Sequence, residues 1–348
     1  MKTLLEQKCE AELVVLAKEA RGLLATGDLD GAVALLLKHE KKCRLGSCWD
    51  ATKSTCLSLL EMLLDAGKWD ALSANILLLC KRRSQHQKVQ TGIIKGMVHA
   101  VDATPDVATK LTLISTLRDV AEGKIFAEVE RARLTMQLVQ MKEADGEIED
   151  AAKLLGDVTV ETCGAMEQKE KAHFLIEQMR LYLLNADFVR TRIVSRKVTR
   201  ETLSEPGFEE LKGHFYDKLI ELEQHSGDTL ALCRAHLAKA NTPSLLLLDD
   251  GRWENALQRA TLFAVLAPHG PMQVDAVARL RAVFPKQYSE VAAMASFDEL
   301  LTQFSTDEIC AWPLAEADAI LAHPVCCVAA ALASWCLVFG VWCLVPFP

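Results

Sequence analysis

Cysteine and histidine side chains are the residues of this sequence best suited to chemistry, because thiolates and imidazoles bind zinc and act as nucleophiles. Cys43, Cys48 and Cys56 lie close together, at spacings of five and eight residues. These spacings match no common zinc knuckle, and no second pair of ligands follows. We therefore predict that no metal binds there and that these thiols have no functional role.

The other thiols and the histidines give no stronger signal. Cys9, Cys80 and Cys233 sit among apolar residues at helical spacing, where a cysteine is usually a small core residue. The nine histidines include His39, His99, His214 and His236. They form neither an HExxH motif nor a close pair with a downstream aspartate, so a hydrolytic zinc site is not indicated.

Motifs of nucleotide and acyl-transfer sites are also missing from the sequence. There is no GxxxxGK[ST] loop and no strand-borne GxGxxG, so backbone amides arranged to hold phosphates are not indicated. A GxSxG motif is absent too. Catalytic triads assemble from distant parts of a chain, so an enzyme is kept as the last alternative. We predict no catalytic residue, no cofactor and no metal.

Three arginines are the candidate partner-contact residues. Arg192, Arg196 and Arg200 fall at positions i, i+4 and i+8 of a predicted helix whose other side is apolar, with Val189 and Ile193. Two interpretations stay open. In the first, the three cations face solvent or form ion pairs with carboxylates of the neighbouring repeat. In the second, they bind an acidic partner subunit.

Composition narrows the class of protein. The chain has 348 residues, a formal net charge of -8 and a pI near 5.7. A general nucleic-acid binder would carry a basic face, so no nucleic acid is expected as a partner. Residues 1–24 contain scattered charges and lack the apolar core of a signal peptide. The thiols are therefore expected to be reduced.

Amphipathic helices must position these side chains. Apolar residues recur at i, i+3, i+4 and i+7 in two early segments, Leu13, Leu16, Ala17 and Ala20, and Leu29, Ala32, Val33 and Leu36. Alternation typical of strands is nearly absent. The pattern predicts an all-α protein.

The turns between the predicted helices resemble one another. Glycine follows an apolar helix and an acid begins the next helix in residues 27–32, 67–71 and 146–151, with weaker copies at 185–188 and 105–108. The aligned apolar residues are Leu29, Trp69, Val107, Ile148 and Phe188, and they are spaced by 40, 38, 41 and 40 residues. This period predicts a TPR-like helical-repeat solenoid. A non-repetitive helical bundle is the alternative.

Proline usage predicts the domain boundary. Residues 1–205 contain only Pro105, whereas prolines recur from Pro206 onward. We predict a solenoid over residues 1–205, a second helical domain over 206–318 and an apolar tail over 319–348.

Several segments resemble the non-ATPase regulatory subunit 12 family, PCI-module subunits of the proteasome lid. They are residues 151–155, 160–167, 177–181 and 187–191, followed by 222–225, 253–257, 266–268 and 301–306. The resemblance is strongest between about 128 and 312 and implies that residues 206–318 are the helical part of a PCI module. It also implies a non-catalytic scaffold of the regulatory particle lid, in cytoplasm and nucleus, that supports ubiquitin-dependent protein degradation. Its implied partners are other lid subunits, including the deubiquitinase subunit, with the base and core particle as further candidates.

The C-terminal end departs from that family. After Trp312 the likeness fades, and no Asp, Glu, Lys or Arg follows Asp318. The family's winged helix is therefore predicted to be missing. Residues 325–345 are long and apolar enough to span a bilayer. The tail is either the product of a mistaken or alternative terminal exon, which we favour, or a membrane anchor. The alternative functions are thus a tail-anchored helical-repeat adaptor and a PCI subunit of the signalosome.

Overall fold

All regular secondary structure in the described residues is helical, which confirms the predicted all-α class. The computed structural model describes residues 4–242, 252–283, 292–306 and 320. Within these ranges no helix combines the length and apolar character needed to cross a bilayer. The predictions about the apolar tail and the missing winged helix concern residues outside the described ranges.

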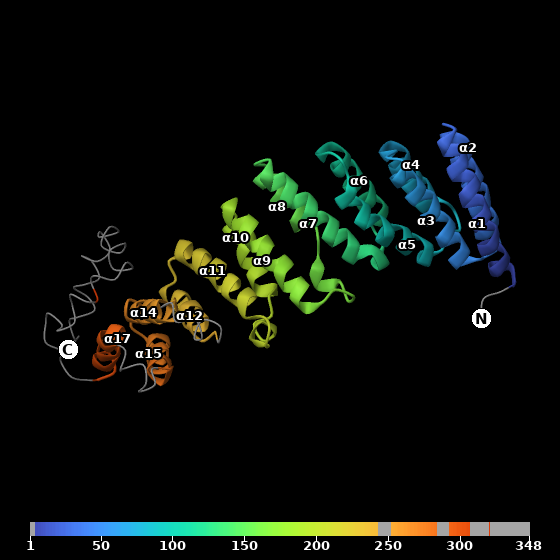
Figure 1. Ribbon diagram of the computed structural model, residues 1–348. Coiled ribbons are helices and arrows are strands. Elements are labelled where there is room, and N and C mark those ends of the chain that lie inside the picture. Colours follow the sequence, from blue (N-terminus) through green and yellow to red (C-terminus); the bar gives the residue numbers. More distant parts are fainter. Residues whose placement is uncertain (1–3, 243–251, 284–291, 307–319, 321–348) are drawn as a thin grey trace. The chain divides into compact units, whose positions relative to one another are not determined.

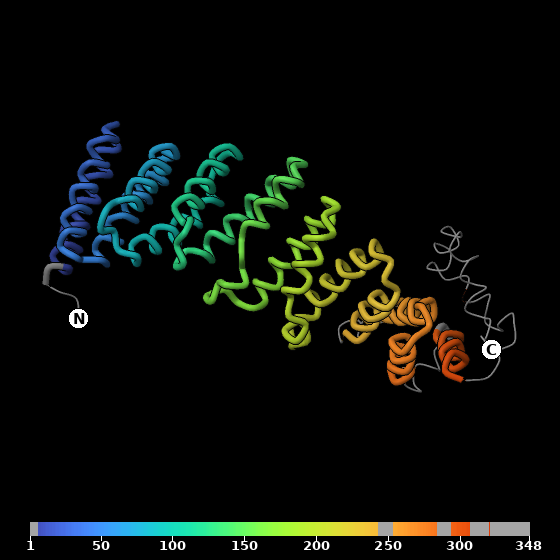
Figure 2. The backbone as a smooth tube through the Cα atoms, turned by 180° about the vertical axis from the view of Figure 1, so that it is seen from behind, coloured from blue at the N-terminus to red at the C-terminus, as the bar shows by residue number. Residues whose placement is uncertain are grey.

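The chain forms two compact units, residues 1–167 (unit 1) and 168–348 (unit 2). Unit 1 consists of helix pairs, with short 3-10 helices in some connections (Figures 1 and 2). Its elements are α1 (Leu4–Ala25), α2 (Leu29–Leu45), α3 (Trp49–Asp65), α4 (Trp69–Lys81), α5 (Gln87–Val98), η1 (His99–Ala103), α6 (Val107–Ala121), η2 (Ile125–Ala127), α7 (Glu128–Ala144), α8 (Ile148–Gly156) and η3 (Val160–Thr162).

The first helices of successive pairs in unit 1 lie side by side. α3 contacts both α1 and α5, and α5 contacts α7. Their apolar faces form one core, in which Leu60, Leu63, Ile93 and Leu134 are fully buried. Since each pair buries its apolar face against the next pair, the arrangement is that of a helical repeat.

The repeat period read from the sequence is confirmed by the helix boundaries. Each of the five aligned residues is the first residue of the second helix in its pair, namely Leu29 in α2, Trp69 in α4, Val107 in α6, Ile148 in α8 and Phe188 in α10. The structure adds one more start in the same series, Thr229 of α12, which follows Phe188 by 41 residues.

Aspartates cap several of these second helices. The carboxylate accepts a hydrogen bond from the backbone amide three residues later, at 2.8 to 3.0 Å, for Asp28, Asp106, Asp187 and Asp228. Such a cap satisfies one amide that has no partner within the helix. The segment at 105–108, a poor copy in sequence, thus shares the aspartate cap with the others, although no left-handed residue precedes it.

We expect Gly146→Ala to lower the free energy of unfolding by about 1 kcal/mol, because Gly146 has φ +82° and a side chain is strained in that left-handed region. The midpoint of urea unfolding should fall while its slope stays constant. Gly164→Ala is the matched control, since Gly164 also faces open space but without a positive φ. Equal midpoints for the two variants would contradict the assigned role.

Unit 2 begins with a further helix pair and continues with more helices. Its described elements are α9 (Gln168–Leu184), α10 (Phe188–Lys197), η4 (Thr202–Ser204), α11 (Glu209–Ser226), α12 (Thr229–Ala240), α14 (Arg252–Val265), α15 (Pro271–Val283) and α17 (Ala292–Gln303). The predicted boundary at 205 falls between α10 and α11, inside this unit. The three-domain division stays a prediction.

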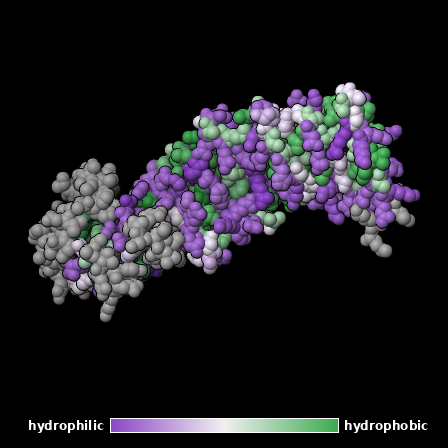
Figure 3. Space-filling view, in the orientation of Figure 1, coloured by the Kyte–Doolittle hydropathy of each residue, from purple (hydrophilic) through white to green (hydrophobic). Residues whose placement is uncertain are grey.

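The helices of unit 2 enclose a core of their own. Leu257, Ala260, Leu280, Met294 and Leu301 are buried between α12, α14, α15 and α17. In the face shown in Figure 3, hydrophilic residues cover most of the surface, and hydrophobic residues appear as smaller green areas between them. Clusters of exposed apolar side chains therefore differ clearly from the hydrophilic surface around them.

Candidate partner-contact site

α10 presents an apolar strip to solvent. The helix packs on α9, and its Thr191 and Val194 are buried. Val189 and Ile193, on the outer side, keep 74% and 54% of their surface exposed. Exposed apolar side chains that lie next to each other are a feature of interaction surfaces. The strip of Val189 and Ile193 therefore makes α10 a candidate contact surface.

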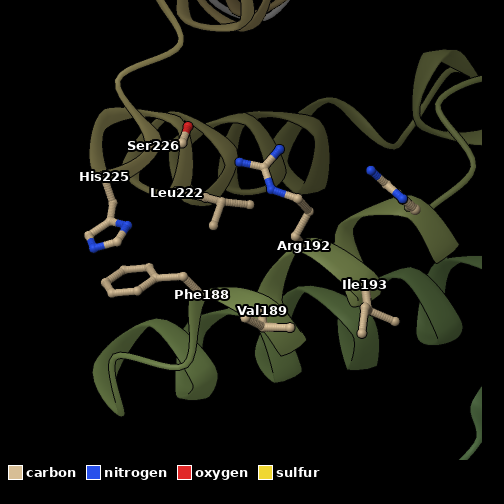
Figure 4. Close-up of a pocket in the computed structure, with 8 residues that line it drawn as sticks. Phe188, Val189, Arg192, Ile193, Leu222, His225 and Ser226 are labelled. Atoms are coloured by element: carbon tan, nitrogen blue, oxygen red, sulfur yellow. The ribbon is translucent and has the colours of Figure 1, made fainter.

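A shallow pocket of about 300 Å³ lies between α10 and α11 (Figure 4). Its lining residues come from both helices and are mostly apolar or cationic: Phe188, Val189, Arg192, Ile193, Arg196, Leu222, His225 and Ser226. We call these eight residues the α10–α11 face.

Arg192 forms a two-pronged ion pair with Glu223 of α11. Its two terminal nitrogens lie 3.0 and 2.9 Å from the two carboxylate oxygens of Glu223, and Ser226 Oγ donates to the same carboxylate at 2.8 Å. Glu223 is buried and raises the pKa of Arg192 through this hydrogen bond. The positive charge of Arg192 is therefore paired with a carboxylate of the neighbouring helix pair in the same chain.

Phe188 and His225 close one end of the pocket. Their rings stack with centroids 3.5 Å apart and planes 10° from parallel, and Figure 4 shows the two rings lying over each other. We did not select Phe188, Glu223 or His225 as site residues from the sequence. The signal was present, because residues 187–191 and 222–225 were two of the segments that carried the family resemblance.

The other two candidate arginines differ from Arg192. Arg196 is exposed, lines the pocket and has no hydrogen-bond or ion-pair partner among the described residues. Arg200 does not share this face: the prediction that all three lie on one helix is wrong, because α10 ends at Lys197. The buried Val198 has extended backbone, with ψ 117°, and turns the chain away. Arg196 is thus the arginine of this face that has no ion-pair partner among the described residues.

The cysteines are grouped differently from their order in the sequence. Cys43 and Cys48 lie together, but Cys56 is buried elsewhere, with its sulfur 3.9 Å from the amide nitrogen of Gln85. Cys9 and His39, from other parts of the chain, join Cys43 instead. This cluster belongs to unit 1, whereas the α10–α11 face belongs to unit 2.

The fold is that of an all-α helical-repeat protein, and the α10–α11 face is its candidate contact surface. Comparison with known proteins agrees: the family model described as PSMD12/CSN4, N-terminal, matches residues 31–246. The 26S proteasome non-ATPase regulatory subunit 12 of Dictyostelium discoideum is 34% identical over 311 residues, which cover 88% of this chain and 68% of that protein. This chain belongs to the PSMD12/CSN4 family.

Further relatives carry related names. The 26S proteasome regulatory subunit RPN5 of Saccharomyces cerevisiae is 32% identical over 295 residues, covering 84% of this chain and 65% of that protein. The homolog A of subunit 12 from Arabidopsis thaliana is 34% identical over 311 residues, covering 82% and 69%. The chain thus spans about two thirds of the length of these relatives.

Proposed function

We propose that this chain is a scaffold subunit of the regulatory particle of the 26S proteasome and acts through protein contacts. The observation that supports this most is its membership of the family, since the relatives compared above are regulatory subunits of that particle. The fold agrees, because stacked helix pairs present extended surfaces to partners.

The finer parts of this proposal follow from the same relationship. The subunit is non-catalytic, lies in the lid and supports ubiquitin-dependent degradation in cytoplasm and nucleus. Its partners are other lid subunits, including the deubiquitinase subunit, with base and core particle as further neighbours. The signalosome alternative has weaker support, because the named relatives are proteasome subunits.

The α10–α11 face gives this proposal a physical contact. Val189 and Ile193 supply exposed apolar surface, and Arg196 supplies a cation beside it. A partner surface with apolar side chains flanked by a carboxylate complements both features. We therefore propose that one contact with a neighbouring proteasome subunit forms at this face.

Affinity purification of the tagged chain tests the proposal directly. Proteasome subunits should co-purify in amounts comparable to the chain, as measured by quantitative mass spectrometry with peptides from residues 167–180 as the reference. Co-purification of signalosome subunits alone, or recovery only from detergent-extracted membranes, would replace the proposal with one of the two alternatives.

We expect Val189→Asp to reduce co-purification of proteasome subunits by about tenfold, since a carboxylate in an apolar contact centre removes roughly the binding energy of one central residue. Val107→Asp is the matched control. Both valines are exposed in the first turn of the second helix of a repeat. A carboxylate at either position interacts favourably with the positive end of the helix dipole, so neither substitution should destabilise its helix. Equal recovery with both variants would place the contact elsewhere on the chain.

A further inference from the structure

Two helices of unit 1 bring two thiols and an imidazole together in its interior. Cys9 lies on α1, and His39 and Cys43 lie one turn apart on α2. All three are buried, and their ligand atoms lie within 4.8 Å of one another. A fourth donor is close by, because Cys48 is buried in the same cluster, at the turn that leads into α3.

The spacing of the donor atoms fits one tetrahedral metal ion. Both ring nitrogens of His39 lie 3.7 Å from Cys43 Sγ. A tetrahedral zinc ion with Zn–S near 2.3 Å and Zn–N near 2.0 Å separates a sulfur and a nitrogen ligand by about 3.5 Å. The i, i+4 relation places both side chains on one face of α2, and Cys9 reaches that face from α1.

The His39 ring is held between α3 and α1, because Nδ1 lies 3.1 Å from Thr55 Oγ1 and Nε2 lies 3.8 Å from Glu12 Oε2. Thr55 Oγ1 donates its single proton to the carbonyl of Ala51 at 2.8 Å. In the tautomer with its proton on Nδ1, His39 donates to this oxygen at 3.1 Å. Nε2 then carries the lone pair that a metal ion needs, which is the orientation that outer contacts impose on metal-binding histidines.

Cys48 is placed to complete the ligand set. Its thiol is hydrogen-bonded with Cys9 and also lies 3.4 Å from the carbonyl of Gly46. Three thiolates and one imidazole are a common closed ligand set for structural zinc.

We propose that Cys9, His39 and Cys43 bind one Zn²⁺, with Cys48 as the fourth ligand. Thiolate and imidazole ligands in a tetrahedral set favour zinc over hard cations such as magnesium. Each thiol releases its proton to solvent when its sulfur bonds the ion, and no electron is transferred. The ion holds α1 to α2 and to the turn before α3, independently of the proposed function.

This site differs from the sequence-based prediction of no metal. That prediction considered Cys43, Cys48 and Cys56 as neighbours in sequence, whereas the structure replaces Cys56 with Cys9 and His39.

The test is the metal content of the full chain, purified under reducing conditions from cells grown with zinc. We expect about one zinc per chain after dialysis, measured by inductively coupled plasma mass spectrometry. Exchange with Co²⁺ should give thiolate-to-cobalt charge-transfer absorption. Less than about one zinc in ten chains together with no such band, or a disulfide within the cluster, would overturn the proposal.

Variants separate the ligands from other buried cysteines. Cys43→Ala should weaken zinc binding on the order of 100-fold, and Cys56→Ala, an equally buried cysteine outside the cluster, should leave it unchanged. Thr55→Val keeps all donors and nearly the same shape, and it should weaken binding about tenfold through His39. Equal zinc loss in Cys43→Ala and Cys56→Ala would refute the assignment, and unchanged binding in Thr55→Val would refute the role of His39.

Discussion

Replacing Phe215 by alanine should lower the free energy of unfolding of unit 2 by about 3–5 kcal/mol. Phe215 lies on α11, is fully buried and packs edge-on against Tyr216 with ring centroids 5.2 Å apart. Its removal takes a large apolar side chain from the core and leaves a cavity. Because whole domains are stable by only about 5–15 kcal/mol, we expect this variant to be partly unfolded at 37 °C.

Hydrogen exchange measured peptide by peptide would check this expectation. Protection should fall in peptides of α9 to α12, while the helices of unit 1 keep theirs. Met272→Ala serves as the control, because Met272 lies on α15 with more than half of its surface exposed. An equal loss of protection in the two variants would show that Phe215 has no special place in the core.

Acid should destabilise unit 2 through His236, by at most about 3 kcal/mol. Burial, aided by the charges of Arg259 and Lys239, lowers the pKa of His236 to about 4, from its ordinary value of 6.5. The unfolded chain therefore binds more protons between these values. The stability from the neutral ring is fully present above pH 6.5 and is lost as the pH falls toward 4.

Denaturant unfolding at a series of pH values between 7 and 4 measures this loss. His236 stacks near Phe263, and neither ring nitrogen has a hydrogen-bond partner among the described residues. His236→Leu should consequently flatten the pH dependence, whereas His214→Gln, at an exposed position on α11, should leave it unchanged. An unaltered slope in His236→Leu would assign the acid sensitivity to other groups.

Local signals explain why the repeat could be read from the sequence. A helix start is defined by a few adjacent residues, as at Gly27 and Asp28, where a left-handed glycine ends one helix and a carboxylate caps the next. The same chemistry recurs with little change at Gly227 and Asp228, a copy that we did not recognise in the sequence. Recurrence at a near-constant period needs no knowledge of distant contacts.

The partners of individual side chains required the folded chain. Arg192 meets Glu223 across 31 residues of sequence, and Cys9 meets Cys43 across the α1–α2 turn. The spacing of these residues in the sequence does not predict a contact, because loop length and helix packing determine which helix faces meet. The same reason explains Arg200, which left the predicted face when the burial of Val198 ended α10 early.

Local sequence patterns were sufficient to predict the all-α class and the repeat period, and the resemblance of several segments was sufficient to predict the family. These depend on periodicity and turn chemistry, which act over a few residues. The tertiary structure pairs Arg192 with Glu223 and leaves Arg196 exposed beside an apolar strip. It also brings two cysteines and a histidine together. Such sites arise only when helices pack, because packing joins side chains that are far apart in the chain.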